Sequence, residues 1–235
     1  MPLYESFDHI VAKLWTPIKL NMVTIMSLPL LQNHWELIYS NQSHADLSWY
    51  QSVPKISLEL INQHASSKEN KIIDIGCGES FLVDSLIDQG YKNLTLLDLS
   101  SKALQNVQKR LKNLGPIPLN IIGDVLSVEL ESNKYDIWHD RACFHFLIKK
   151  EDIQKYLEKA LHALSDKGKI ILSTFAIDGP ERCSNLPVHR HNQESIKKIF
   201  GKHFLIDLSL HENHITPKGK TQSFNFFVLT RKYTR

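Results

Sequence analysis

Two glycines and one aspartate are the residues of this chain whose types and spacing most clearly point to chemistry. An apolar run at residues 72–75 leads into Gly76-Cys77-Gly78, and a second apolar run at residues 94–99 contains Asp98. Glycines let the backbone approach a ligand closely, and a carboxylate at the end of the next strand can accept hydrogen bonds from both hydroxyls of a ribose. The pattern predicts a site for a cofactor that contains a nucleoside.

The residues around the glycine turn indicate which cofactor of this kind it takes. A dinucleotide-binding loop would have a third glycine where Phe81 stands, and Glu79 would repel the pyrophosphate at short range. S-adenosylmethionine carries no phosphate, so the loop favours it over NAD, and an NAD-dependent oxidoreductase is the less favoured alternative. The chain also has no Gly-x-x-x-x-Gly-Lys-Ser/Thr motif, which argues against a nucleotide hydrolase.

The elements that must position these residues alternate along the chain. Apolar runs rich in β-branched residues alternate with helical periodicity, which is typical of a mostly parallel sheet covered by helices on both faces. A helix is expected after Asp98, with Ser100 or Ser101 as its cap, and another is expected to begin near Asn192. Strands are expected at residues 72–75, 94–99, 119–122, 135–138, 169–174, 205–210 and 223–230.

These motifs resemble those of the class I S-adenosylmethionine-dependent methyltransferases over residues 33–232. The resemblance implies an α/β fold, a Rossmann-like doubly wound sheet of seven strands that is mostly parallel with an antiparallel last strand. It also implies direct in-line transfer of a methyl group. Ser80 departs from the family, because many members have a small glycine there. The residues that the resemblance assigns to the cofactor are Asp74, Gly76, Cys77, Gly78, Asp98, Leu99, Asp124 and Val125.

Two tryptophans upstream of the glycine turn are expected to cover this cofactor. His34-Trp35-Glu36 and Ser48-Trp49-Tyr50-Gln51 are similar to segments that form a flap over the cofactor in a subset of bacterial-looking family members. An aromatic face favours a sulfonium through a cation–π contact, so Trp35 and Trp49 are predicted to lie at the methionine end. The alternative is that they only pack an N-terminal helix against the sheet.

The methyl acceptor is expected beside the exits of the fourth and fifth strands, where open α/β sheets place their ligands. The fourth-strand exit carries Asp140, Arg141 and His145. Asp140 is predicted to orient an acceptor amine or hydroxyl, His145 to take its proton, and Arg141 to contact it. The alternative is that Asp140 caps the following turn and that His145 is a satisfied, partly buried histidine.

The segment after the fifth strand, residues 175–191, is long enough to be a lid or a wall of the acceptor site. Cys183 and Arg190 are its candidate substrate contacts. His189 and His191 invite a metal site, but a pair two positions apart lacks the further ligands of a zinc site, and no metal is expected.

Length and composition bound the remaining possibilities. The chain has 235 residues, of which 42% are hydrophobic, and this is enough for one sizeable core. Residues 1–32 are expected to be an extension of undetermined role, with Met26 as an alternative start. Residues 33–235 are expected to be one methyltransferase domain, in which residues 33–66 supply cofactor-covering helices.

Charge and cysteine content bear on partners and compartment. The net charge of +3 is spread along the chain, so no nucleic-acid partner is expected. No run approaches the roughly 18 continuous apolar residues of a membrane span, so no membrane partner is expected. Three cysteines at wide spacings favour a reducing compartment, and the cytoplasm is the expected location.

The sequence leaves the acceptor open between a protein side chain and a small molecule. It also leaves open the oligomeric state and the use of a general base. A non-catalytic regulatory protein that binds S-adenosylmethionine is a further alternative, and it predicts cofactor binding without turnover.

Overall fold

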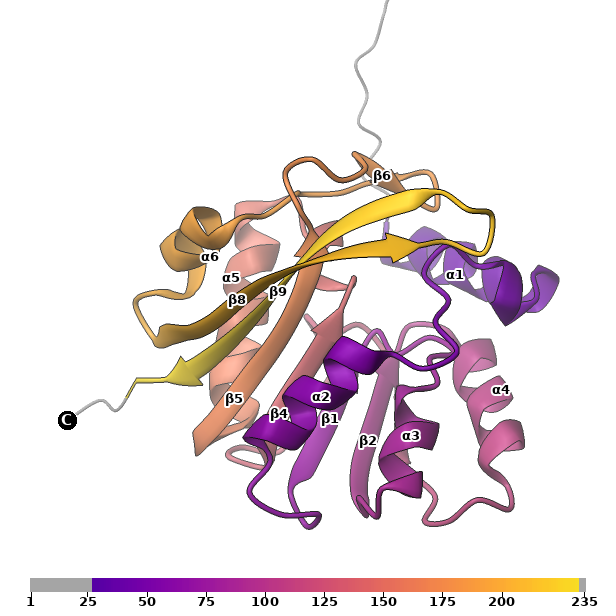
Figure 1. Cartoon of the computed structure of the whole chain (residues 1–235), viewed down its shortest axis with the longest axis horizontal. Coiled ribbons are helices and arrows are strands. Elements are labelled where there is room, and N and C mark those ends of the chain that lie inside the picture. The colour runs from indigo at the N-terminus through magenta and orange to yellow at the C-terminus, as the bar shows by residue number, and fades with distance from the viewer. Residues whose placement is uncertain (1–26, 233–235) are drawn as a thin grey trace, which may run out of the picture.

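A seven-stranded sheet organises the computed structural model, which describes residues 27–232 (Figure 1). The strands lie in the order β3-β2-β1-β4-β5-β9-β8. β3, β2, β1, β4 and β5 pair in parallel, whereas β9 pairs antiparallel with both β5 and β8, which confirms the predicted sheet. The strands are β1 (Lys71–Ile75), β2 (Asn93–Asp98), β3 (Leu119–Ile122), β4 (Tyr135–Arg141), β5 (Leu164–Phe175), β8 (Phe204–Ile215) and β9 (Thr221–Arg231).

Helices cover both faces of this sheet, as Figure 1 shows. They are α1 (Leu28–Asn41), α2 (Lys55–His64), α3 (Leu82–Asp88), α4 (Ser101–Leu111), α5 (Lys150–Ala163) and α6 (Gln193–Phe200). Apolar residues of α2, α3 and α4 pack in one core layer, and those of α5 and α6 pack in the other. Neighbouring strand residues such as Ile72 and Ile73 belong to opposite layers, because successive side chains of a strand point to opposite faces. The sheet is therefore doubly wound, as expected.

The predicted helix caps are present. Ser100 is the N-cap of α4, and its hydroxyl accepts a hydrogen bond from the backbone N–H of Ala103. Asn192 caps α6 in a reciprocal capping box with Ser195. These two caps fix the residues at which α4 and α6 begin. They therefore also fix where each helix starts relative to the strand that precedes it.

The fourth strand and the segment after the fifth differ from the sequence expectation. β4 continues to Arg141, beyond the predicted end at residue 138, because the polar residues His139 and Asp140 are buried with hydrogen-bond partners. The expected irregular segment contains a short antiparallel hairpin of β6 (Arg182–Cys183) and β7 (Leu186–Pro187). The hairpin gives this segment a defined shape above the end of β5.

The N-terminal boundary also differs from the prediction. α1 begins at Leu28, before the expected domain start at residue 33, so residues 28–32 belong to the folded cover. The rest of the expected extension, including Met26, lies outside the described residues. Within residues 27–232, no helix combines the length and the apolar character needed to cross a membrane.

Candidate active site

A cavity of about 910 Å³ opens at the carboxyl ends of the parallel strands. Residues that follow or end β1, β2, β3, β4 and β5 all contribute to its wall. The main groups are Gly76, Asp98, Leu99, Asp124, Val125, Arg141 and Cys183, together with the rings of Trp35, Tyr39, Trp49, Phe146, Phe175 and Phe224. A smaller cavity of about 540 Å³ shares Trp49, Gly76 and Arg141 with it and includes Asp74, Cys77, Glu79 and His139.

The glycine turn after β1 lies where the two cavities meet, and Gly76 lines both of them. Gly76 and Gly78 have backbone φ angles of +60° and +52°, which residues other than glycine rarely adopt. A Cβ atom at Gly76 would lie 2.7 Å from the Cβ of Cys143, and one at Gly78 would collide with the hydroxyl of Tyr39. Both positions therefore require glycine for backbone conformation and for space.

Asp98 at the end of β2 organises this turn. One carboxylate oxygen accepts a hydrogen bond from the N–H of Gly78 at 2.8 Å, and the other accepts one from the N–H of Ser100 at 2.8 Å. The side chain is buried, and burial raises the pKa of Asp98 to about 6. The carboxylate thus holds the glycine turn and the start of α4 together, and it faces the cavity where a ribose was expected.

Leu99, Asp124 and Val125, which were predicted to bind the cofactor, line the larger cavity together with Asp98. Asp124 accepts a hydrogen bond from the N–H of Leu126 at 3.0 Å, which fixes the turn after β3. The N–H of Gly123 donates to the carbonyl of Asp98 at 2.9 Å. The ends of β2 and β3 therefore present two carboxylates at one end of the larger cavity.

Asp74 belongs to a buried network that the sequence did not reveal. The Nδ1 of His139 lies 2.6 Å from its carboxylate, and the Nε2 of His139 lies 2.9 Å from the hydroxyl of Ser57 on α2. Since an ionised carboxylate only accepts, we assign the proton to Nδ1, so that Ser57 donates to Nε2. The order of groups matches a serine hydrolase triad, but Ser57 is buried and lines neither cavity. The network joins α2 to β1 and β4.

An aromatic cluster covers the other side of the larger cavity. The ring of Trp35 on α1 meets Trp49 edge to face at 5.9 Å and Phe146 at 5.4 Å, measured between ring centroids. Tyr39, one turn further along α1, stacks against Trp35 at 6.3 Å. The two predicted tryptophans therefore line the cavity side by side, and Tyr39 and Phe146 extend the aromatic surface between them.

Glu36 fastens α1 over the cavity. Its carboxylate accepts hydrogen bonds from the N–H groups of Ser101 at 2.7 Å and Lys102 at 3.0 Å and from the hydroxyl of Ser100 at 2.9 Å. These donors lie at the N-terminus of α4, where the helix dipole favours a negative charge. α1 is thus tied to the same helix start that Asp98 positions.

Arg141 at the end of β4 lines both cavities. Its Nη1 donates to the carbonyl of Trp49 at 3.1 Å, and its guanidinium lies over the ring of Phe224 at 4.9 Å. Nearby, burial raises the pKa of the Cys183 thiol to about 12, so this thiol is neutral at physiological pH. Both predicted acceptor contacts are therefore in the cavity wall.

The structure gives Asp140 a different place from the one that the sequence suggested. Its carboxylate is buried and accepts hydrogen bonds from the N–H groups of Cys143 and Phe144 and from the hydroxyl of Tyr156 on α5. Asp140 points to the opposite face of the sheet from Arg141, because the two are neighbours on a strand. Asp140 lines neither cavity, and its hydrogen bonds cap the turn that leads into the short helix η4 (Phe144–Phe146).

His145 and Arg190 also lie outside both cavities. His145 packs against the rings of Phe146 and Phe175, and burial lowers its pKa to about 3, so it is a very weak base there. Arg190 donates to Glu181 at 3.1 Å and to the carbonyl of Gly179 at 3.3 Å. The structure thus places His145 in packing contacts and Arg190 in contacts that brace its loop, away from the cavity where the acceptor was expected.

Several residues that line the larger cavity were not predicted from the sequence. Tyr39 lies four positions after Trp35 on one helix, so helical spacing could have found it. Gln222 and Phe224 of β9 line the cavity only because β9 pairs with β5, and no local pattern shows that register. In residues 27–232, no three His, Cys, Asp or Glu side chains are grouped as metal ligands.

A family model described as a methyltransferase domain matches residues 66–221, from just before β1 to the start of β9. The chain belongs to this methyltransferase family. The matched part is a class I S-adenosylmethionine-dependent methyltransferase domain, of the EC 2.1.1 type, and the oxidoreductase alternative is not supported.

Curated relatives and solved structures agree with this assignment. The eEF1A lysine and N-terminal methyltransferase of Danio rerio is 21% identical over 197 residues, which cover 84% of this chain and 26% of the relative. The tRNA U34 carboxymethyltransferase of Helicobacter pylori is 27% identical over 144 residues, which cover 60% of this chain and 52% of the relative. The chain thus spans about a quarter of the first of these relatives and half of the second.

Two solved structures share the fold. One is described as "Conversion of a Disulfide Bond into a Thioacetal Group during Echinomycin Biosynthesis", with a TM-score of 0.71, 14% identity, and coverage of 87% of this chain and 94% of that one. The other is the Burkholderia thailandensis 1,6-didemethyltoxoflavin-N1-methyltransferase, with a TM-score of 0.64, 14% identity, and coverage of 83% and 81%.

The capping role of Asp140 predicts a specific mutant phenotype for this methyltransferase. We expect Asp140→Asn to lower the free energy of unfolding by about 1–2 kcal/mol, because it weakens buried hydrogen bonds. Since Asp140 lines neither cavity, the dissociation constant of S-adenosylhomocysteine should change by less than about twofold. Chemical denaturation and calorimetry measure the two quantities. A large loss of binding with unchanged stability would return Asp140 to the active site.

Proposed function

We propose that this methyltransferase transfers the methyl group of S-adenosylmethionine to a small molecule that binds beside Arg141. The observation that carries the proposal is the lining of the larger cavity, which the aromatic residues of α1 partly cover. Apolar and aromatic side chains form most of its wall, and a few polar groups lie among them, which is usual for small-molecule sites. α1 and its aromatic residues form part of its wall, so a large acceptor surface would have to displace this cover.

The cofactor is proposed to lie with its nucleoside towards the ends of β2 and β3. Asp98 would accept hydrogen bonds from the ribose hydroxyls, and Asp124 would meet the adenine amino group. The methionine portion would then extend over the turn at Gly76. Trp35 and Trp49 would place their rings beside the sulfonium. The hydrogen bonds of Asp98 to Gly78 and Ser100 support this placement, because they fix the carboxylate and the turn in one geometry.

Methyl transfer in this cavity would rely on alignment and exclusion of water. The acidic side chains that line the larger cavity are Asp98 and Asp124, both at the nucleoside end, and no histidine is among its lining residues. The sulfonium has a neutral leaving group, so a strong general base is optional. An enzyme can then gain most of its rate by holding donor and acceptor in line in a desolvated site. The acceptor would supply its own nucleophilic atom.

A protein side chain is the second candidate acceptor, because a curated relative is named as an eEF1A lysine and N-terminal methyltransferase. This chain covers only 26% of that relative, so its substrate is not carried over. The covered cavity favours the small molecule.

The acceptor class can be tested with S-adenosylmethionine labelled in its methyl group. The purified protein is incubated with the labelled cofactor and a cell extract, and macromolecules are separated from small molecules. We expect label in a small molecule that chromatography separates from S-adenosylmethionine and its breakdown products, and none there above background with Asp98→Asn as the matched control. Label in a protein band would establish the second candidate. Label in neither fraction, with cofactor bound, would support the non-catalytic alternative.

A further inference from the structure

Arg141 carries hydrogen-bond donors that the protein does not use. Its Nη1 donates to the carbonyl of Trp49, but its Nε and Nη2 are shielded from solvent and have no partner within residues 27–232. A buried polar group without a partner costs free energy, and the cost is greater when the group is charged. These two atoms form one edge of the guanidinium, which matches the two oxygens of a carboxylate.

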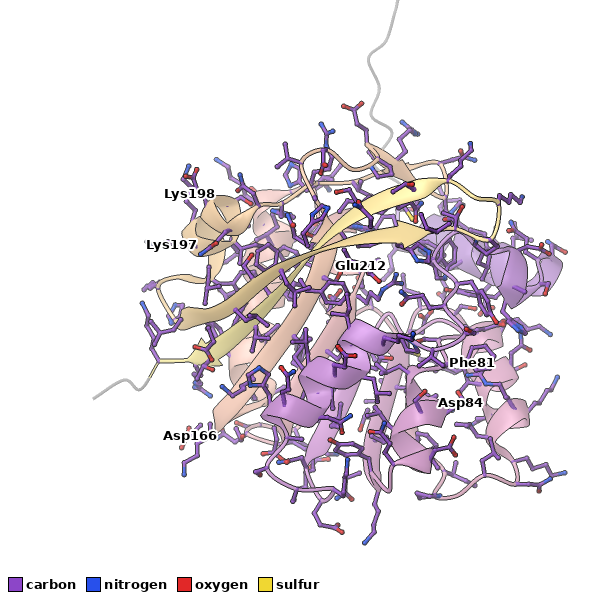
Figure 2. All side chains as sticks on the ribbon, in the orientation of Figure 1. Phe81, Asp84, Asp166, Lys197, Lys198 and Glu212 are labelled. Atoms are coloured by element: carbon purple, nitrogen blue, oxygen red, sulfur yellow. The ribbon has the colours of Figure 1, made fainter. Side chains whose placement is uncertain are left out.

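The groups around Arg141 leave this edge of the guanidinium without an ion pair among the described residues. The thiol of Cys183 is neutral, and the ring of Phe224 lies against the guanidinium. Burial lowers the pKa of Arg141, and the neighbouring Glu212 raises it, so the two effects oppose each other. Glu212 on β8, which Figure 2 shows above α2, accepts from Gln51 through Oε1 at 3.0 Å, and its Oε2 is buried without a hydrogen-bond partner. It forms no ion pair with Arg141 among the described residues.

Gln222 provides a second polar group in the same wall. It lies on β9 and lines the larger cavity with Arg141, and its Oε1 is buried without a partner. A side-chain amide carries both an acceptor oxygen and an NH2 donor, and rotation by 180° exchanges their places. Rotated in this way, Gln222 would present an NH2 donor where its unpaired oxygen lies.

We propose that Arg141 and Gln222 form a carboxylate-binding site at the acceptor end of the cavity. The proposal rests on the proposed function and names the chemistry of its ligand. The carboxylate comes from one of two sources, the methionine portion of the cofactor or the methyl acceptor. In the second case, the acceptor is an organic acid whose apolar body lies against Phe146, Phe175 and Phe224.

The site also bears on the choice between acceptors. A lysine side chain enters an active site as an amine that is protonated in water, and Arg141 would repel that charge at short range. A carboxylate is attracted by the same charge and needs no base to remove a proton from it. The site therefore favours acids over amines, in agreement with the cavity that favours small molecules.

Binding of two cofactor fragments tests the first source. Calorimetry compares S-adenosylhomocysteine with 5′-methylthioadenosine, which lacks the amino-acid portion, on the wild type and on Arg141→Gln. If Arg141 binds the methionine carboxylate, the variant should bind S-adenosylhomocysteine about tenfold more weakly and 5′-methylthioadenosine unchanged, since a hydrogen bond to a charged group has this strength. Arg190→Gln is the matched control, because Arg190 lines neither cavity, and it should bind both like the wild type.

A pair of simple probes tests the second source on protein saturated with S-adenosylhomocysteine. The probes are 3-phenylpropionate and 3-phenylpropionamide, which differ only in the charge of the polar end. If the acceptor supplies the carboxylate, the wild type and Arg190→Gln should prefer the acid, and Arg141→Gln should lose about tenfold of that preference. A Gln222→Leu variant should lose part of it.

The outcomes separate this inference from the proposed function. The carboxylate site is supported if Arg141→Gln loses affinity for S-adenosylhomocysteine in the first experiment or loses the preference for the acid in the second. Which of the two is lost identifies the source of the carboxylate. If Arg141→Gln matches the wild type in both arms, the inference is overturned while cofactor binding stands. If the wild type does not bind S-adenosylhomocysteine at all, the proposed function itself fails.

Discussion

Replacing Asp98 with asparagine is expected to weaken the binding of S-adenosylhomocysteine by about 100-fold, because charge-assisted hydrogen bonds to the ribose hydroxyls are lost. Asparagine keeps the size of the side chain and one acceptor oxygen, so it can still accept from the N–H of Gly78 or of Ser100, but not from both. Calorimetry measures the affinity, and a thermal melt without ligand reports on folding. Normal affinity in a folded Asp98→Asn variant would show that the ribose binds elsewhere.

Asp136 offers the matched control for this variant. Its carboxylate accepts a hydrogen bond from the backbone N–H of Lys71 at 2.9 Å, much as Asp98 accepts one from Gly78, but it lies at the opposite end of the strands. We expect Asp136→Asn to bind S-adenosylhomocysteine like the wild type. Equal losses of affinity for S-adenosylhomocysteine in Asp98→Asn and Asp136→Asn would point to a general effect on folding.

The same carboxylate predicts a pH dependence of cofactor binding. Burial raises the pKa of Asp98 to about 6, so the group gains a proton as the pH falls through that value. The protonated acid accepts hydrogen bonds less well, and affinity should therefore be constant above pH 7 and fall below pH 6. The limit is about tenfold for each pH unit if only the ionised form binds. Asp98→Asn should show no such fall over this range.

Replacing Trp35 with leucine is expected to weaken the binding of S-adenosylmethionine much more than that of S-adenosylhomocysteine. S-adenosylmethionine carries a positive sulfonium and S-adenosylhomocysteine does not, whereas both have the same body. A desolvated cation–π contact contributes about 2 kcal/mol, so Trp35→Leu should bind S-adenosylmethionine about 30-fold more weakly and S-adenosylhomocysteine less than about threefold. Competitive binding measures both constants.

Trp35→Phe is the control for this experiment, since phenylalanine keeps an aromatic face in the cluster. It should retain most of the preference for the sulfonium. Equal loss of both cofactor forms in Trp35→Leu would mean that the tryptophan only packs α1 against the sheet, which is the alternative that the sequence left open.

The parts of the site that the sequence predicted are encoded by contiguous residues. The glycine turn, Asp98 and Asp124 each follow an apolar strand, and the carboxyl ends of parallel strands meet at one edge of a sheet. Trp35 and Trp49 were found because their motifs resemble a family segment. Residues of these kinds are recognisable from the few residues around them, so a single sequence was enough to predict their place in the cavity wall.

The parts that the sequence missed depend on pairing and on side-chain direction. Asp140 and Arg141 are adjacent in a motif dense with polar groups, yet they point to opposite faces, and only Arg141 reaches the cavity. Gln222 and Phe224 reach the wall beside Arg141 through the pairing of β9, which places Phe224 opposite Phe175 of β5 and Gln222 opposite His214 of β8, and no local pattern shows this pairing. The partner of His139 on α2 is set by packing in the same way.

A crystal structure of the protein with S-adenosylhomocysteine would test the central claim most directly. We expect the ribose hydroxyls on the carboxylate of Asp98, the adenine beside Asp124, and the sulfur facing Trp35 under α1. Electron density for the ligand away from the ends of β1 and β2, or with its sulfur turned away from the aromatic cluster, would contradict it.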